Sequence, residues 1–138
     1  MKTAVVYWSG TGNTEAMAGF VADGLREKGA ECTVYPAADF NPSQLAELDA
    51  VAFGCPSMGA EELEETEFAP MFDLCDISGK RIVLFGSYGW GDGEWMRTWE
   101  GTCRERGAVL AADSVICNEA PDDDAAAACK TLGAALVG

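Results

Sequence analysis

The sequence of 138 residues contains no histidine and no Cys-x-x-Cys pair. Its six cysteines are widely spaced, at Cys32, Cys55, Cys75, Cys103, Cys117 and Cys129. This spacing disfavours zinc sites, iron–sulfur sites and a disulfide scaffold, and most of the thiols are expected to pack as small buried hydrophobes. Without histidine the chain lacks the commonest general base and the Ser-His and Cys-His nucleophile pairs. We therefore expect neither a metal site nor hydrolytic catalysis.

Basic residues are also scarce. Nine Lys and Arg stand against 23 Asp and Glu, and the formal net charge is −14. Such a charge disfavours nucleic acid and anionic membranes as partners, and it favours proteins with basic surfaces. No apolar stretch approaches the roughly 20 residues that span a bilayer, and the first apolar run ends at Ser9. We expect one domain over residues 1–138 in a cytoplasmic protein without nucleic-acid or membrane partners.

Apolar runs alternate with helical patterns along the whole chain. Strands are predicted over residues 4–8, 32–35, 50–55, 81–87 and 108–117, and helices over 13–28, 42–47, 68–74, 93–106 and 122–136. This alternation predicts an α/β fold, a doubly wound five-stranded parallel sheet of order 2-1-3-4-5 with helices on both faces. A ligand in that architecture sits at the carboxyl ends of the strands, beside the first strand. Three loops reach that edge, at residues 9–14, 56–65 and 87–93.

The first loop has the composition of a phosphate site. Trp8 closes the first strand, and the turn that follows consists of Ser9, Gly10, Thr11, Gly12, Asn13 and Thr14. Glycines let backbone N–H groups converge, and the helix that starts here adds its unpaired donors and the positive end of its dipole. No Lys or Arg lies between Lys2 and Arg26. Neutral hydrogen bonds suit a permanently bound cofactor better than a phosphoryl group in transfer.

The other two loops suggest a clamp for a planar ligand. The third loop contains Ser87, Tyr88, Gly89, Trp90, Gly91 and Asp92, and the second contains Pro56, Ser57, Met58, Gly59, Ala60 and Glu61. An indole flanked by glycines is better explained by stacking on a ligand ring than by core packing. A thioether also packs well on a π-system, so a ring is predicted between Met58 and Trp90. Trp95 and Trp99, one helical turn apart, are predicted to pack in the core.

Taken together, the three loops resemble those of the flavodoxins, specifically the short-chain forms of anaerobic bacteria. The resemblance runs through residues 7–14, 54–68, 87–96 and 118–121. It implies non-covalently bound FMN, with the phosphate in the loop 9–14 and the isoalloxazine between Met58 and Trp90. It further implies that Glu61 accepts from flavin N3–H, and that the backbone of Gly89 and Trp90 faces the N1/O2 edge.

The resemblance also implies a redox-responsive peptide between Gly59 and Ala60. In the family, this peptide turns its carbonyl toward N5–H when the flavin is half reduced, which stabilises the neutral semiquinone. Glycine at position 59 tolerates both conformations. Position 60 is more often Gly, Asp, Asn or Ser in the family, and Ala accepts positive φ less readily. The flip is expected, with a smaller energetic advantage.

These features predict a low-potential one-electron carrier that shuttles between semiquinone and hydroquinone, not an enzyme. At about 10 Å each nearby carboxylate disfavours added negative charge on the flavin by roughly 0.4 to 0.8 kcal/mol before salt screening. The carboxylates concerned are Glu61, Glu62, Glu64, Glu65, Glu67, Asp92 and Asp122 to Asp124. The expected partners are ferredoxin-type reductases and oxidoreductases with basic docking surfaces, and a monomer is expected.

Other functions of the same fold fit less well. An FMN-dependent NAD(P)H quinone or nitro reductase is the alternative, but no second phosphate loop or basic adenosine-phosphate pocket is evident. A phospho-switch receiver needs carboxylates at the ends of the first and third strands, where this chain has Trp8 and Cys55. A cysteine-dependent phosphatase needs an arginine closing a short loop after its cysteine, and Cys55 has none.

Overall fold

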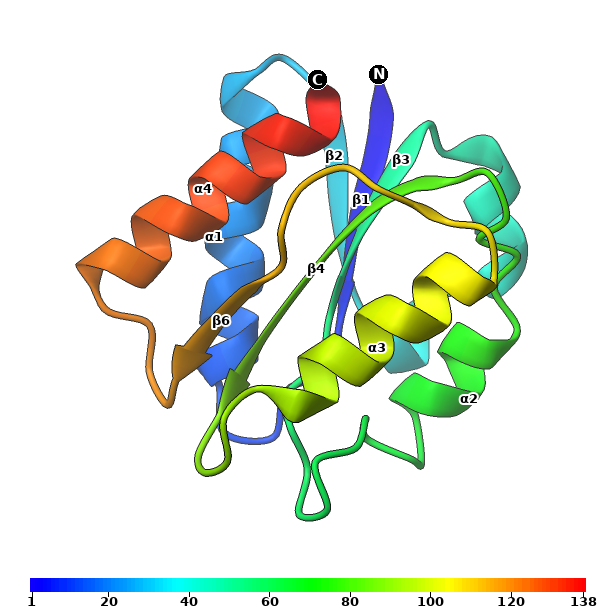
Figure 1. Ribbon diagram of the computed structural model, residues 1–138. Helices are drawn as coiled ribbons and strands as arrows, with labels where there is room; N and C mark the ends of the chain where they lie inside the picture. Colours follow the sequence, from blue (N-terminus) through cyan, green and yellow to red (C-terminus); the bar gives the residue numbers. More distant parts are fainter.

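A computed structural model describes all residues from Met1 to Gly138, and it contains one parallel sheet (Figure 1). The strands are β1 (Lys2–Tyr7), β2 (Glu31–Pro36), β3 (Ala50–Gly54), β4 (Arg81–Tyr88), β5 (Val109–Leu110) and β6 (Val115–Asn118). Their order is β2-β1-β3-β4-β5, and β6 also pairs with β4. Every pair is parallel. The predicted fold class and strand order are confirmed.

Helices cover both faces of the sheet (Figure 1). The helices are α1 (Asn13–Glu27) and α4 (Asp123–Val137) on one face, and α2 (Phe68–Asp73) and α3 (Glu94–Glu105) on the other. Two short 3-10 helices, η1 (Ala37–Asp39) and η2 (Pro42–Glu47), lie between β2 and β3. All five predicted helices are present, and the one over residues 42–47 is a 3-10 helix.

The two faces bury separate cores because β1 and β3 are covered on both sides. Their side chains alternate between a core under α2 and α3, which contains Phe53 and Trp99, and a core under α1 and α4, which contains Val5 and Met17. This explains why these strands read as continuous apolar runs. Trp95 and Trp99 are each 2% exposed. The prediction that both pack in the core is confirmed.

The prediction of one continuous fifth strand over residues 108–117 is wrong. Leu110 lies opposite Ile82 on β4, and Val115 lies opposite Phe85. The four residues 111–114 therefore lie opposite only residues 83 and 84 of β4. The extra residues interrupt the strand pairing and bend the chain away from β4, as at a β-bulge. The Ser114 hydroxyl donates to the Glu100 carboxylate at 2.7 Å, which attaches this excursion to α3. β5 and β6 share the fifth position of the sheet.

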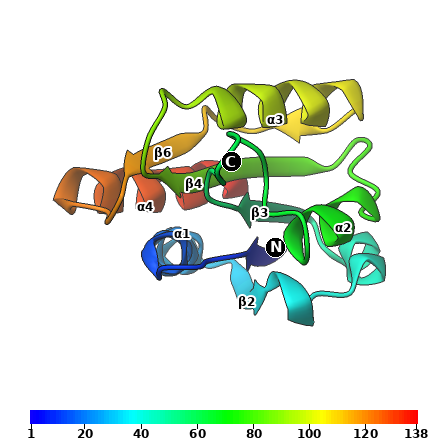
Figure 2. The ribbon, with the colours of Figure 1, turned by 90° about the horizontal axis from the view of Figure 1, so that it is seen from below.

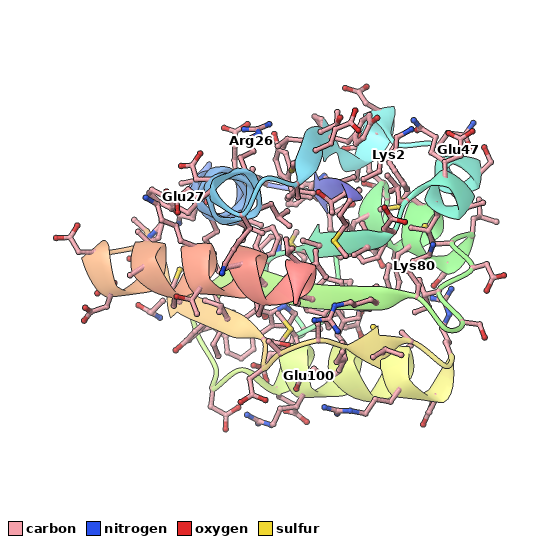
Figure 3. All side chains as sticks on the ribbon, turned by 90° about the horizontal axis from the view of Figure 1, so that it is seen from above. Lys2, Arg26, Glu27, Glu47, Lys80 and Glu100 are labelled. Carbon is pink, nitrogen blue, oxygen red and sulfur yellow. The ribbon has the colours of Figure 1, made fainter.

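The parallel strands direct their carboxyl ends to one end of the molecule. Figure 2 views that end, where the loops after β1, β3, β4 and β6 lie. Figure 3 views the opposite end, where Lys2, Arg26 and Lys80 lie together with Glu27 and Glu47. No Lys or Arg occurs in residues 9–14, 56–66 or 87–96. The loops at the carboxyl end therefore lack basic residues, whereas the opposite end carries residues of both charges. None of the helices has the length and apolar character needed to cross a bilayer.

Candidate functional site

A cleft of about 400 Å³ opens where the loops after β1, β3, β4 and β6 meet. It is lined by Ser9, Gly10, Thr11, Asn13, Thr14, Pro56, Ser87, Tyr88, Gly89, Glu119 and Ala120. All but the last two were predicted as site residues, and they come from all three predicted loops. No lysine or arginine lines the cleft. Hydroxyls, amides and backbone N–H groups are the donors available to an anionic ligand there.

Gly12 shapes the loop at the start of α1. Its φ of 95° is in the left-handed region, which glycine adopts without strain, and it is the N-cap of the helix. The Ser9 Oγ accepts from the Gly12 amide at 3.0 Å and closes the loop on itself. The side chains of Thr11 and Asn13 have no hydrogen-bond partner in the protein, and the first amides of α1 have no carbonyl acceptor. These groups are free to bind a phosphate.

Thr14 and Ser87 lie deeper and join the elements beneath the cleft. Thr14 is 1% exposed, and its Oγ1 accepts from the Ser87 amide at 3.4 Å. The Ser87 hydroxyl donates to the Glu119 carbonyl at 2.6 Å, and the Glu119 amide donates to the Tyr88 carbonyl at 2.8 Å. Glu119 has a positive φ of 57° at this attachment. Ser87 therefore holds the loop after β6 against the cleft.

Sequence reasoning missed Glu119 and Ala120 as lining residues. Residues 118–121 resembled the family loop, but no glycine or aromatic residue marked them as ligand contacts. The available signal was a polar turn before Pro121 at the carboxyl end of a predicted strand. Because β6 pairs with β4, that turn comes to the same edge as the phosphate loop.

The second loop forms a closed turn over residues 58–62. The Met58 amide donates to the Glu62 carbonyl at 2.9 Å, and the Glu61 amide donates to the Met58 carbonyl at 2.8 Å. Positive φ falls on Glu61, at 50°, and on neither Gly59 nor Ala60. Ser57 ties the loop to β4, since its amide donates to the Ser87 carbonyl at 3.0 Å. Met58, Gly59 and Ala60 line a hollow of about 370 Å³ separate from the main cleft.

Glu61 carries a buried oxygen that lacks a donor. Its Oε1 is inaccessible and has no hydrogen-bond partner. The carboxylate rests against Gly91, where an added Cβ would lie 2.2 Å from Oε1. Gly91 also has φ 84°, so both its conformation and its neighbour require glycine. A buried acceptor left unpaired is unfavourable by about 1–3 kcal/mol. This oxygen therefore lacks a donor at the meeting point of the second and third loops.

The remaining predicted residues lie beside the main cleft. The Trp90 side chain is 60% exposed on the rim, and exposed Asp92 forms an ion pair with Arg97 at 2.9 Å. Trp8 does not line the main cleft, and its indole Nε1 donates to the Glu67 carboxylate at 3.0 Å. Trp8 and Gly12 line a neighbouring hollow of about 390 Å³. Trp8 thus lies beside Ser9 and Gly10, which line both this hollow and the main cleft.

Two ionisable groups under the second loop have strongly shifted pKa values. Burial alone would raise the pKa of Glu64, but hydrogen bonds from the Thr66 hydroxyl and from the amides of Phe68, Glu67 and Thr66 more than offset it and lower the pKa to about 2. Burial raises the pKa of the Cys55 thiol to about 12. Glu64 is therefore ionised at neutral pH, and Cys55 is a thiol without nucleophilic character.

Comparison with known proteins identifies the family. The Flavodoxin family matches residues 5–132. This chain belongs to the flavodoxin family. It is 44% identical to the flavodoxin of Megasphaera elsdenii over 133 residues, which covers 95% of both chains. It is 45% identical to the flavodoxin of Clostridium beijerinckii over 121 residues, covering 86% of this chain and 88% of the other.

The likeness extends to three dimensions. The solution structure of two-electron reduced Megasphaera elsdenii flavodoxin superposes with a TM-score of 0.89, at 43% identity over 97% of both chains. A flavodoxin structure from the domain Archaea gives a TM-score of 0.84 at 30% identity, over 99% of this chain and 96% of the other. The chain is thus an FMN-binding electron carrier that works with redox partner proteins, and not an enzyme. The predicted family, cofactor and electron-transfer function are confirmed.

Proposed function

We propose that the chain carries single electrons at low potential between redox proteins with basic surfaces. In this proposal residues 1–138 form one FMN-binding domain, which acts as a cytoplasmic monomer. Bound FMN supplies the one-electron chemistry, and the chain binds it and sets its electrostatic surroundings. The proposal rests most directly on the sign of the charge around the cleft, where carboxylates gather and cations are absent from all three loops.

The residues present fit the two ends of FMN. Thr11, Asn13 and the first amides of α1 offer unpaired neutral donors, which suits the phosphate. At the other end, the unpaired Oε1 of Glu61 suits the N3–H of the ring. Met58 and Trp90 are proposed to contact the two faces of the ring, since one is half-buried and the other exposed on the rim of the adjoining loops.

Low potential follows from the carboxylates of the second loop. Glu62, Glu65 and Glu67 are exposed, and Glu64 is held ionised by four hydrogen bonds. The second one-electron reduction adds negative charge near these groups, so each carboxylate opposes it. The same charges attract a basic partner, mainly by accelerating association.

Paired charge-removal variants test this proposal. We expect Glu62→Gln with Glu65→Gln to raise the second midpoint potential by roughly 20–35 mV per carboxylate at low salt, from about 0.4–0.8 kcal/mol each. The matched control is Glu27→Gln with Glu47→Gln, which removes the same charge at the far end of the molecule (Figure 3). Spectroelectrochemical titration measures both midpoints. Equal shifts in the two double variants would show that the loop carboxylates do not set the potential.

A further inference from the structure

The segment between β3 and α2 carries the 58–62 turn but contains no helix or strand of its own. It crosses the carboxyl edge of the sheet in Figure 2. Its first half is tied to β4 through the Ser57 amide and the Ser87 carbonyl. The turn itself is closed only by its own two backbone hydrogen bonds. A separate contact is therefore needed to fix the chain where it leaves the turn.

Glu64 provides that contact on the helix side. It is 4% exposed, whereas Glu62, Glu65 and Glu67 are exposed. Its Oε2 accepts from the amide of Thr66 at 2.8 Å and from the Thr66 hydroxyl. Its Oε1 accepts from the amides of Glu67 and Phe68, both at 2.8 Å. Since Phe68 is fully buried at the start of α2, the carboxylate attaches the loop to a fixed element.

Glu64 is attached to the sheet as well. Its amide donates to the Cys55 Sγ at 3.4 Å. Cys55 is itself immobilised, because its amide donates to the Phe85 carbonyl at 3.1 Å and its carbonyl accepts from the Trp95 indole at 3.2 Å. An added Cβ on Gly86 would lie 2.2 Å from that carbonyl oxygen, so the neighbouring strand is in close contact. Residues 56–63 thus form a loop whose two ends meet at Cys55 and Glu64.

We propose that Glu64 is a positioning residue that sets the conformation of the 58–62 turn toward the cofactor. This inference rests on the proposed role of the turn. The carboxylate does not line the main cleft and accepts four hydrogen bonds from residues that do not line it, so it acts through the backbone it fixes. A carboxamide at this position would turn an NH₂ group toward two of the donors. The exit of the turn would then keep only the backbone hydrogen bonds of Glu64 to Cys55 and Ala69 and part of its side-chain attachment.

The test compares Glu64→Gln with two controls in the FMN-loaded protein. Glu65→Gln removes the same charge from an exposed neighbour that makes no side-chain hydrogen bond. Arg81→Gln removes bonds to the carbonyls of Ala135 and Leu136 at the far end, and it lowers stability without touching the loop. The readouts are amide hydrogen exchange at Met58 and Glu61 and the two midpoint potentials.

We expect Glu64→Gln to accelerate exchange at both amides at least tenfold and to shift the first midpoint more than the second. Glu65→Gln should leave exchange unchanged, and Arg81→Gln should leave both midpoints unchanged. If Glu64→Gln does not fold, Cys55→Ala, which removes only the sulfur acceptor, should give the same pattern more weakly. A Glu64→Gln protein that only loses stability, with wild-type exchange at Met58 and Glu61, would overturn the inference. That outcome is independent of the Glu62 and Glu65 test of low potential.

Discussion

Replacing Glu64 by glutamine should change how stability depends on pH. The carboxyl group has a pKa of about 2 in the folded chain against an ordinary value of 4.5. Its pKa is lowered by folding, so it stabilises the fold above about pH 4.5, and that contribution is lost as the pH falls toward 2. Glutamine does not titrate and therefore lacks this dependence.

The difference between the folded and unfolded pKa values of Glu64 sets the size of its contribution to the unfolding free energy. A difference of about 2.5 pH units corresponds to about 3 kcal/mol at pH 7, at roughly 1.4 kcal/mol per unit. About 2 kcal/mol of this is lost by pH 3, where the unfolded carboxyl is already protonated and the folded one is still largely ionised. The gap in unfolding free energy between wild type and Glu64→Gln should therefore narrow by about 2 kcal/mol from pH 7 to pH 3.

Urea unfolding of the FMN-free protein at pH 7, 5, 4 and 3 measures this gap. Glu65→Gln is the control, since Glu65 is exposed and makes no side-chain hydrogen bond. Other carboxylates titrate equally in wild type and variant, so their effects cancel in the difference. A gap that keeps the same size at all four pH values would refute the reasoning, because the Glu64 carboxylate would then have no preferential stabilisation in the fold.

Three further outcomes are expected. The double variant Thr11→Ala with Asn13→Ala should weaken FMN binding by roughly 1–3 kcal/mol per hydrogen bond lost and leave riboflavin binding nearly unchanged in fluorescence titrations. Equal losses of binding free energy for FMN and riboflavin would contradict the assignment of residues 9–14 to the phosphate. Ala60→Gly should raise the first midpoint potential by up to about 40 mV. Rotating the Gly59–Ala60 peptide into a type II turn places residue 60 at positive φ, where Gly is about 1 kcal/mol more favourable than Ala. An unchanged or lower midpoint potential in spectroelectrochemistry would contradict this. Electron transfer to a basic partner should slow as salt rises in stopped-flow measurements, and flat rates would exclude an acidic docking surface.

Local patterns in the sequence were sufficient for most of the architecture. The continuous apolar runs of β1 and β3 and the helical spacing in α1 and α3 appear in the structure within a few residues of the predicted bounds. The glycine-rich loop at residues 9–14 could be interpreted in the same way, because the need for positive φ at Gly12 is a property of the local backbone. The spacing of Trp95 and Trp99 placed both in the core.

Features that depend on contacts between distant segments required the tertiary structure. The break between β5 and β6 arises from the register of two short strands against β4 and from the Ser114–Glu100 hydrogen bond. Pairing of β6 with β4 brings Glu119 to the cleft. Neither register nor a long-range hydrogen bond leaves a periodic signal in the sequence.

The carboxylates of the second loop show this limit most clearly. Glu61, Glu62, Glu64, Glu65 and Glu67 are chemically identical. Apart from the role that the family resemblance implies for Glu61, the sequence alone determined only that the loop is acidic. In the folded chain Glu64 is buried and its carboxylate accepts four hydrogen bonds. One oxygen of Glu61 has no partner and lies against Gly91, and Glu67 accepts from the Trp8 indole. These differences follow from the donors that the tertiary structure places within reach of each carboxylate. Burial and hydrogen bonding, not residue type, decide whether a carboxylate is held by the protein, left without a partner or exposed to solvent.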